Sequence, residues 1–180
     1  MSSRKLFGSL AIMFLLPGLG NVSQAGIDRF TPNYGGENRV WRITDDPAWR
    51  HTANYHNVNC FSPDGRYICY ARYHPYQDHP QSVVYVYDLQ KDRETRVGDG
   101  SDPRWANTRN RLFYIRPSSS GTELAWFDAE SGEKTVMARG VHGIGTPDFM
   151  DRWIYGYRRL PGGGRTGLRV PIRPDVRPEI

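Results

Sequence analysis

Short apolar runs separated by polar turn formers dominate the chain from about residue 57 to residue 157. The runs are rich in aromatic and β-branched residues, which favour β-strands, and they lie at residues 67–70, 83–87, 112–115 and 153–155. Turn formers such as Pro63-Asp64-Gly65 and Glu130-Ser131-Gly132 stand between them. No stretch after the first 25 residues keeps a helical period. The pattern predicts an all-β fold whose strands are covered on both faces.

The apolar runs belong to an internal repeat. Residues 61–70 align with residues 105–114, which lie 44 positions later, and residues 87–95 align with 127–135, which lie 40 positions later. A weaker third copy at 150–155 follows its counterpart by about 41 positions. A period of about 40 to 45 residues with short strands is typical of one four-stranded propeller blade.

We therefore expect a partial β-propeller of about three four-stranded blades over residues 40–158. It begins with an outermost strand at Val40–Thr44. Two full blades follow at about 57–97 and 101–138, and an incomplete third blade at about 144–158. An ordinary β-sandwich with coincidental internal similarity is the alternative.

Two parts of the repeat resemble a known family. Phe61-Ser62-Pro63-Asp64-Gly65-Arg66, followed by Tyr67-Ile68-Cys69-Tyr70, resembles the repeat of TolB-type β-propellers, and Asp102-Pro103-Arg104-Trp105 resembles the entry to the next repeat. The lead-in is similar to that of oligogalacturonate lyases built on this propeller; its matching residues are Arg42-Ile43-Thr44, His51, Asn54, Tyr55 and His56. The resemblance implies the propeller fold over residues 40–157, and many unrelated functions occur on that fold.

Residues 1–25 have the pattern of a secretory signal peptide. Arg4 and Lys5 precede the apolar run Leu6–Leu16, and Ser23-Gln24-Ala25 offers small residues for cleavage after Ala25. The run of about 11 residues is shorter than the roughly 20 that a membrane-spanning helix needs. We expect an exported protein, periplasmic or extracellular, with no membrane span after cleavage and a lead-in at residues 26–39.

The formal net charge of +5 is concentrated at the two ends of the chain. Residues 26–157 hold 16 basic and 17 acidic residues, a net charge of about −1. A surface that binds phosphates needs clustered Lys and Arg, so we expect no nucleic-acid partner.

The expected number of blades is small for a propeller. Closed propellers typically have four to eight blades, whereas the chain holds fewer than four at about 42 residues each. Residues 159–180 lose the strand pattern and are rich in Arg, Pro and Gly, which predicts a disordered tail. An open arc leaves two blade faces uncovered, and an oligomer that completes the ring would cover them.

All five histidines fall on or beside one rim of the expected propeller, formed by the loops between second and third strands and between blades. They are His51, His56, His74, His79 and His142. Imidazole is a common metal ligand and a general base. The candidate ligand-binding residues are His51, Asn54, Tyr55, His56, Arg104 and His142, and the candidate metal ligands are His51, His56 and His142. Solvated loop histidines are the alternative.

The lyase resemblance implies metal-assisted β-elimination, in which a base removes the proton beside a uronate carboxylate and a cation stabilises the developing charge. A divalent metal such as Mn²⁺ would be that cation. Only the segment from His51 to His56 has a counterpart of the family's site here. We therefore expect a module that binds an oligosaccharide or a protein partner. The amino-terminal part of an oligogalacturonate-lyase-like enzyme is the alternative.

Cys60 and Cys69 flank the Pro63-Asp64-Gly65 turn. A two- or four-residue loop would place the two cysteines opposite each other, where a cross-strand disulfide can form. A type I turn with Gly65 as a bulge would instead place Cys60 opposite Ile68. We expect the second arrangement, with two buried thiols in the reduced state.

Overall fold

The computed structural model describes residues 28–30, 40–44, 49–53, 58–73 and 82–172, and these contain strands and no helix. Three antiparallel sheets make up most of the described chain. The first, called blade 1, contains β3 (Arg50–Ala53), β4 (Tyr67–Tyr73), β5 (Ser82–Asp88) and β6 (Arg93–Asp99). Blade 2 contains β7 (Ser101–Trp105), β8 (Arg111–Ser118), β9 (Gly121–Asp128) and β10 (Lys134–Arg139). Blade 3 contains β11 (Gly143–Pro147), β12 (Trp153–Arg159) and β13 (Arg165–Pro171).

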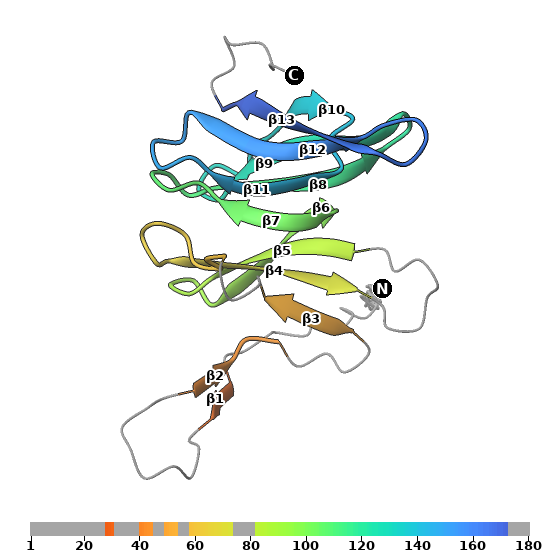
Figure 1. The fold of residues 1–180 in the computed structure, drawn as a ribbon. Helices are drawn as coiled ribbons and strands as arrows, with labels where there is room; N and C mark the ends of the chain where they lie inside the picture. The colour runs from red at the N-terminus through yellow and green to blue at the C-terminus, as the bar shows by residue number, and fades with distance from the viewer. Residues whose placement is uncertain (1–27, 31–39, 45–48, 54–57, 74–81, 173–180) are drawn as a thin grey trace, which may run out of the picture.

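The three blades stack face to face in chain order, so the fold runs from the orange and yellow strands of blade 1 to the blue strands of blade 3 (Figure 1). Within each blade, consecutive strands pair as hydrogen-bonded neighbours. The first strand of blade 2, β7, contacts β4 and β5 of blade 1 and β11 of blade 3. This arrangement confirms the all-β fold and the partial propeller predicted from the repeat.

The repeat also has the same register in every blade. Phe61 pairs with Ile68, Trp105 with Leu112, and Pro147 with Ile154, so each hairpin spans seven positions. Each hairpin also has an equivalent hydrogen bond, donated by the backbone N–H of Ser62, Ala106 or Asp148 to the carbonyl of Tyr67, Arg111 or Trp153. The three blades are therefore copies of one structural unit.

Two apolar clusters fill the spaces on either side of blade 2. The first contains Tyr67, Cys69, Val84, Val86 and Val97 of blade 1, packed with Trp105, Leu112, Tyr114, Ala125 and Phe127 of blade 2. The second joins blade 2 to blade 3 and includes Phe113, Ile115, Leu124, Ile154, Leu168 and Val170. Adjacent residues of one strand point to opposite faces, which explains why Leu112 and Phe113, both fully buried, belong to different clusters. Blade 2 thus separates the two cores.

Three segments differ from the sequence predictions. Val40–Arg42 forms β2, which pairs with β1 (Asp28–Phe30) in a separate two-stranded sheet. The first strand of blade 1 begins at Arg50, ahead of the predicted blade boundary. The predicted disorder from residue 159 is wrong for β13, because this strand buries Leu168 and Val170 against blade 2. The signal-peptide segment and residues 173–180 lie outside the described residues.

The predicted register of the first hairpin is also wrong. The N–H of Cys69 donates to the carbonyl of Cys60 at 2.9 Å, and Phe61 pairs with Ile68. The loop therefore has four residues, 63–66, and the two cysteines stand opposite each other. The Ser62 hydroxyl accepts a hydrogen bond from the Tyr67 N–H at 3.0 Å, which closes the loop without a bulge at Gly65. Both thiols are in the reduced state, which agrees with the prediction. Cys60 is only partly buried, whereas the prediction placed both thiols in buried positions.

Among the residues that the structure describes, no helix has the length and apolar character needed to cross a bilayer.

Candidate ligand-binding site

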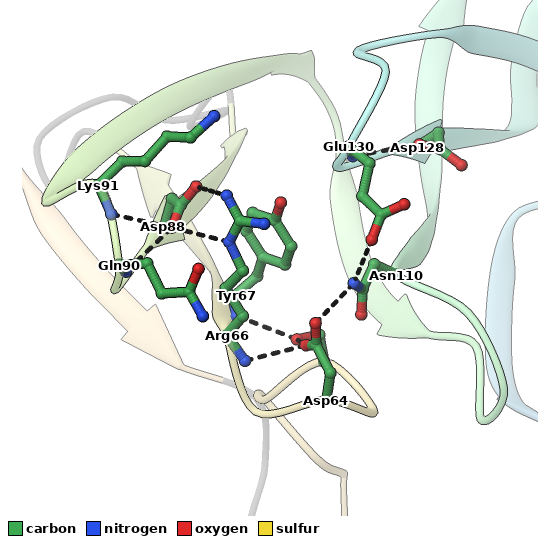
Figure 2. A network of polar contacts seen from close by, with 10 residues as sticks. Asp64, Arg66, Tyr67, Asp88, Gln90, Lys91, Asn110, Asp128 and Glu130 are labelled. Carbon is green, nitrogen blue, oxygen red and sulfur yellow. Dashed lines mark hydrogen bonds and ion pairs between the residues drawn. The ribbon is translucent and has the colours of Figure 1, made fainter.

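One rim of the arc, formed by the turns that connect the first two strands and the last two strands of each blade, carries a network of polar side chains (Figure 2). Asp64 accepts a hydrogen bond from the Asn110 amide at 2.8 Å, which ties the first hairpin turn of blade 1 to that of blade 2. Asn110 also donates to Glu130 at 2.9 Å. These contacts lock neighbouring turns together, which indicates a structural role for this rim.

Asp88 anchors the network in blade 1. Its carboxylate accepts two hydrogen bonds from Arg66, at 3.1 and 2.7 Å, and two from the backbone N–H groups of Gln90 and Lys91 (Figure 2). Burial alone would raise the pKa of Asp88, but the hydrogen bonds from Arg66 and from these two backbone groups outweigh it and lower the pKa below its ordinary value. The ionised Asp88 carboxylate therefore stabilises the turn between β5 and β6.

Asp151 makes the equivalent link between blades 2 and 3. Its carboxylate accepts hydrogen bonds from the backbone N–H groups of Asn107 and Thr108, at 2.8 and 2.7 Å, and from both of their side chains. Asp151 has a φ of 51°, a left-handed conformation that Asp tolerates better than most residues. The rim is thus tied by side chains across both blade junctions.

The histidine rim lies at the other ends of the strands. His51 stands on β3 opposite Arg72, with its ring edge towards Tyr70 at 6.2 Å between ring centroids. His142 lies between β10 and β11, where its Nδ1 is 3.1 Å from the Gly140 carbonyl oxygen and 3.3 Å from the backbone nitrogen of Arg159. Five of the residues predicted for this rim lie in segments outside the described residues: Asn54, Tyr55, His56, His74 and His79.

The described residues do not supply the predicted metal centre. Within them, no three His, Cys, Asp or Glu side chains gather as metal ligands. The Nδ1 of His142 also faces two backbone groups, the Gly140 carbonyl of its own loop and the Arg159 N–H at the end of β12. The proposed set of His51, His56 and His142 stays a prediction, because His56 falls outside the described part of the chain.

An open depression of about 520 Å³ lies on the inner edge of blade 3, next to His142 in sequence. We call it the inner-edge depression; its lining residues are Asp102, Gly143, Ile144, Gly145, Tyr155, Gly156 and Tyr157. Asp102 comes from the first strand of blade 2, and the other residues come from β11 and β12. The sequence-based candidates did not include the residues of β11 and β12. The candidate nearest to the depression is Arg104, whose guanidinium lies 4.0 Å from the Asp102 carboxylate.

Glycine leaves room for an aromatic ring in the depression. A Cβ at Gly143 would lie 2.5 Å from Cε1 of Tyr157, so a larger residue there would displace the Tyr157 ring. Asp102 has a φ of 53° within an irregular part of the β7–β8 pairing, and strained backbone of this kind often occurs at functional sites. Tyr155 is 49% exposed, which makes its ring available to a ligand.

The outward face of blade 3 continues from the depression and combines aromatic rings with arginines. We call it the aromatic–arginine face; it consists of Trp153, Tyr155, Tyr157, Arg165 and Arg169. The Arg169 guanidinium lies 4.5 Å from the ring centroid of Trp153, and that of Arg165 lies 4.8 Å from the centroid of Tyr157. The sequence contains a signal for this face, because aromatic residues occupy every second position from 153 to 157 and side chains two positions apart in a strand share a face.

Comparisons with known proteins support the fold. No protein-family model and no curated protein sequence matches the chain. Among solved structures, TolB from Acinetobacter baumannii is similar with a TM-score of 0.52 and 16% sequence identity, over 75% of this chain and 33% of that one. The propeller domain of the Trilobed protease from Pyrococcus furiosus has a TM-score of 0.47 and 12% identity, over 58% of this chain and 35% of that one.

This chain therefore spans only about a third of the length of either similar structure. The order and register of the three sheets, together with the likeness to TolB, show that the chain folds as blades of a TolB-like β-propeller.

Proposed function

We propose that this protein is an exported ligand-binding module that holds an acidic oligosaccharide in the inner-edge depression. The observation that carries the proposal is that the exposed Tyr155 lines the depression together with Tyr157, Asp102 and three glycines. Binding sites commonly combine apolar or aromatic surface with a few polar groups that fix the ligand's orientation.

The two kinds of side chain have separate tasks in this proposal. The tyrosine rings offer flat apolar faces to the C–H faces of a sugar ring, and their hydroxyls and the Asp102 carboxylate bind sugar hydroxyls. Arg165 and Arg169 border the site on the outward face of blade 3. A guanidinium binds a carboxylate through two parallel hydrogen bonds, so a uronate is a better ligand than a neutral sugar.

Titration calorimetry with trigalacturonate and with the neutral maltotriose tests the proposal. We expect trigalacturonate to bind more tightly, and Tyr155→Ala to weaken it at least tenfold. Arg169→Gln should weaken trigalacturonate binding and leave maltotriose binding unchanged. Phe149→Ala is the matched control, because Phe149 is an 84% exposed aromatic residue in a turn outside the depression. The absence of saccharide binding, or an equal loss in Phe149→Ala, would overturn the proposal.

A further inference from the structure

The two cysteines of the chain are placed for a covalent bond that the structure does not contain. Cys69 donates its backbone N–H to the Cys60 carbonyl at 2.9 Å, and the adjacent residues Phe61 and Ile68 pair directly. Residues directly opposite in an antiparallel pair have side chains on the same face, and their Cα atoms are about 5.5 Å apart when they are hydrogen-bonded. Disulfides span Cα separations of roughly 4.4 to 6.8 Å, so the backbone already satisfies this requirement.

The equivalent pair in blade 2 supports this register independently. The position of Cys60 corresponds to Arg104, and that of Cys69 corresponds to Phe113, 44 residues later in each case. Arg104 and Phe113 are direct partners in the β7–β8 pairing. Two repeats of the fold thus agree that these positions face each other.

The two thiols differ in their access to solvent. Cys69 is fully buried in the apolar cluster between blades 1 and 2, whereas Cys60 is only partly buried. The Trp105 indole N–H of blade 2 donates to the Cys60 carbonyl at 2.8 Å. The pair therefore lies at the junction of the two blades, and Cys60 is the residue that is more accessible to a dissolved reagent.

We propose that Cys60 and Cys69 form a redox-active pair that closes into a cross-strand disulfide when the protein meets an oxidant of the disulfide class. Cys60 is the residue that reacts first, because it is the more exposed of the two. Cys69 is the resolving residue. The bond would fix the first hairpin of blade 1 at the place where blade 2 packs against it.

With glutathione disulfide as the oxidant, the reaction proceeds by two exchanges. The Cys60 thiolate attacks one glutathione sulfur, forms a mixed disulfide and releases the first glutathione thiolate. Cys69 then gives up its proton, and its sulfur attacks the Cys60 sulfur, so that the Cys60–Cys69 bond forms and the second glutathione leaves. Two protein thiols are oxidised, and one glutathione disulfide is reduced to two glutathione molecules.

The test is thiol labelling after native oxidation. The folded protein is incubated with glutathione disulfide, then denatured without reductant and treated with a maleimide, and the intact mass is measured. We expect no maleimide adduct, a loss of two hydrogen atoms from the monomer mass, and recovery of both thiols after native treatment with dithiothreitol. Two adducts, a persistent glutathione adduct or a disulfide-linked dimer would each overturn the proposal.

Single variants separate the two roles. Cys69→Ala keeps Cys60 alone, so we expect it to retain one bound glutathione. Cys60→Ser keeps only the buried thiol, so we expect no glutathione adduct while the protein is folded. Oxidation should also change the fluorescence of the wild-type protein and leave that of Trp105→Phe much less affected, because Trp105 contacts the Cys60 backbone. Equal glutathione labelling of the two cysteine variants would contradict the assignment of roles.

Discussion

Ile154 provides a direct measure of how strongly blade 3 is held to blade 2. Its side chain is 0% exposed and lies in the apolar cluster shared with Phe113 and Leu124 of blade 2. Replacing it with alanine removes three buried carbon atoms and leaves a cavity. Each buried methylene contributes roughly 0.8 kcal/mol before the cavity is counted, and such changes in protein cores cost about 2 to 5 kcal/mol. We expect Ile154→Ala to lower the free energy of unfolding by about 3 kcal/mol.

Urea unfolding followed by tryptophan fluorescence measures this loss. Val136→Ala is the matched control, because Val136 is an apolar strand residue that is 40% exposed; its loss should stay below about 0.5 kcal/mol. Ile154→Val, which removes one methyl group, should fall between the two at about 1 kcal/mol. If Ile154→Ala costs no more than the Val136 control, the packing of blade 3 against blade 2 does not exist in solution.

Three further predictions concern the polar network and the close contacts. Acid should destabilise the protein, because hydrogen bonds lower the pKa of four carboxyl groups despite the opposing effect of burial. The stabilisation from these ionised groups is present above the ordinary pKa of 3.8 and is lost as the pH falls below it. Melting temperatures from pH 7 to pH 2.5 check this, and a melting temperature that does not change with pH would contradict it. The four groups are Asp64, Asp88, Asp128 and Asp148. Gly100→Ala should lower the melting temperature, because the new Cβ would lie 2.4 Å from the Ile115 carbonyl oxygen, whereas Gly167→Ala, with open space around it, should not. Asp151→Ala should cost about 1 to 2 kcal/mol in urea unfolding, because the Asn107 and Thr108 N–H groups lose their acceptor; an unchanged midpoint would show that this link between blades is not formed.

The repeat made the blades predictable from the sequence. Phe61 and Trp105, which align in the sequence repeat, occupy equivalent positions in hairpins of equal length. The sequence similarity between the repeats therefore predicted that they fold in the same way. Boundaries were harder to predict. The strand β13 carries Arg165, Gly167 and Arg169 on its outward face. Because this segment is rich in Arg and Gly, its composition predicted disorder although Leu168 and Val170 alternate with these residues and are buried.

The candidate site and the cysteine register depend on contacts between distant segments. Asp102 and Tyr155 are 53 positions apart and line the same depression because β7 contacts β11, the strand that pairs with the β12 strand of Tyr155. The register at Cys60 depends on the Ser62 hydroxyl, which caps the Tyr67 N–H and favours a four-residue loop over a bulge at Gly65. Turn composition alone permits both loops, so the sequence left this choice open.

Methyl NOE spectroscopy tests the central claim that blade 2 separates blades 1 and 3. Val84 and Leu112 belong to the cluster on one side of blade 2, and Leu124 and Ile154 belong to the cluster on the other. We predict cross-peaks linking methyl groups within each cluster and none between Val84 and Ile154. A Val84–Ile154 cross-peak would place the first and third sheets against each other, as in a sandwich, and would contradict the propeller arc.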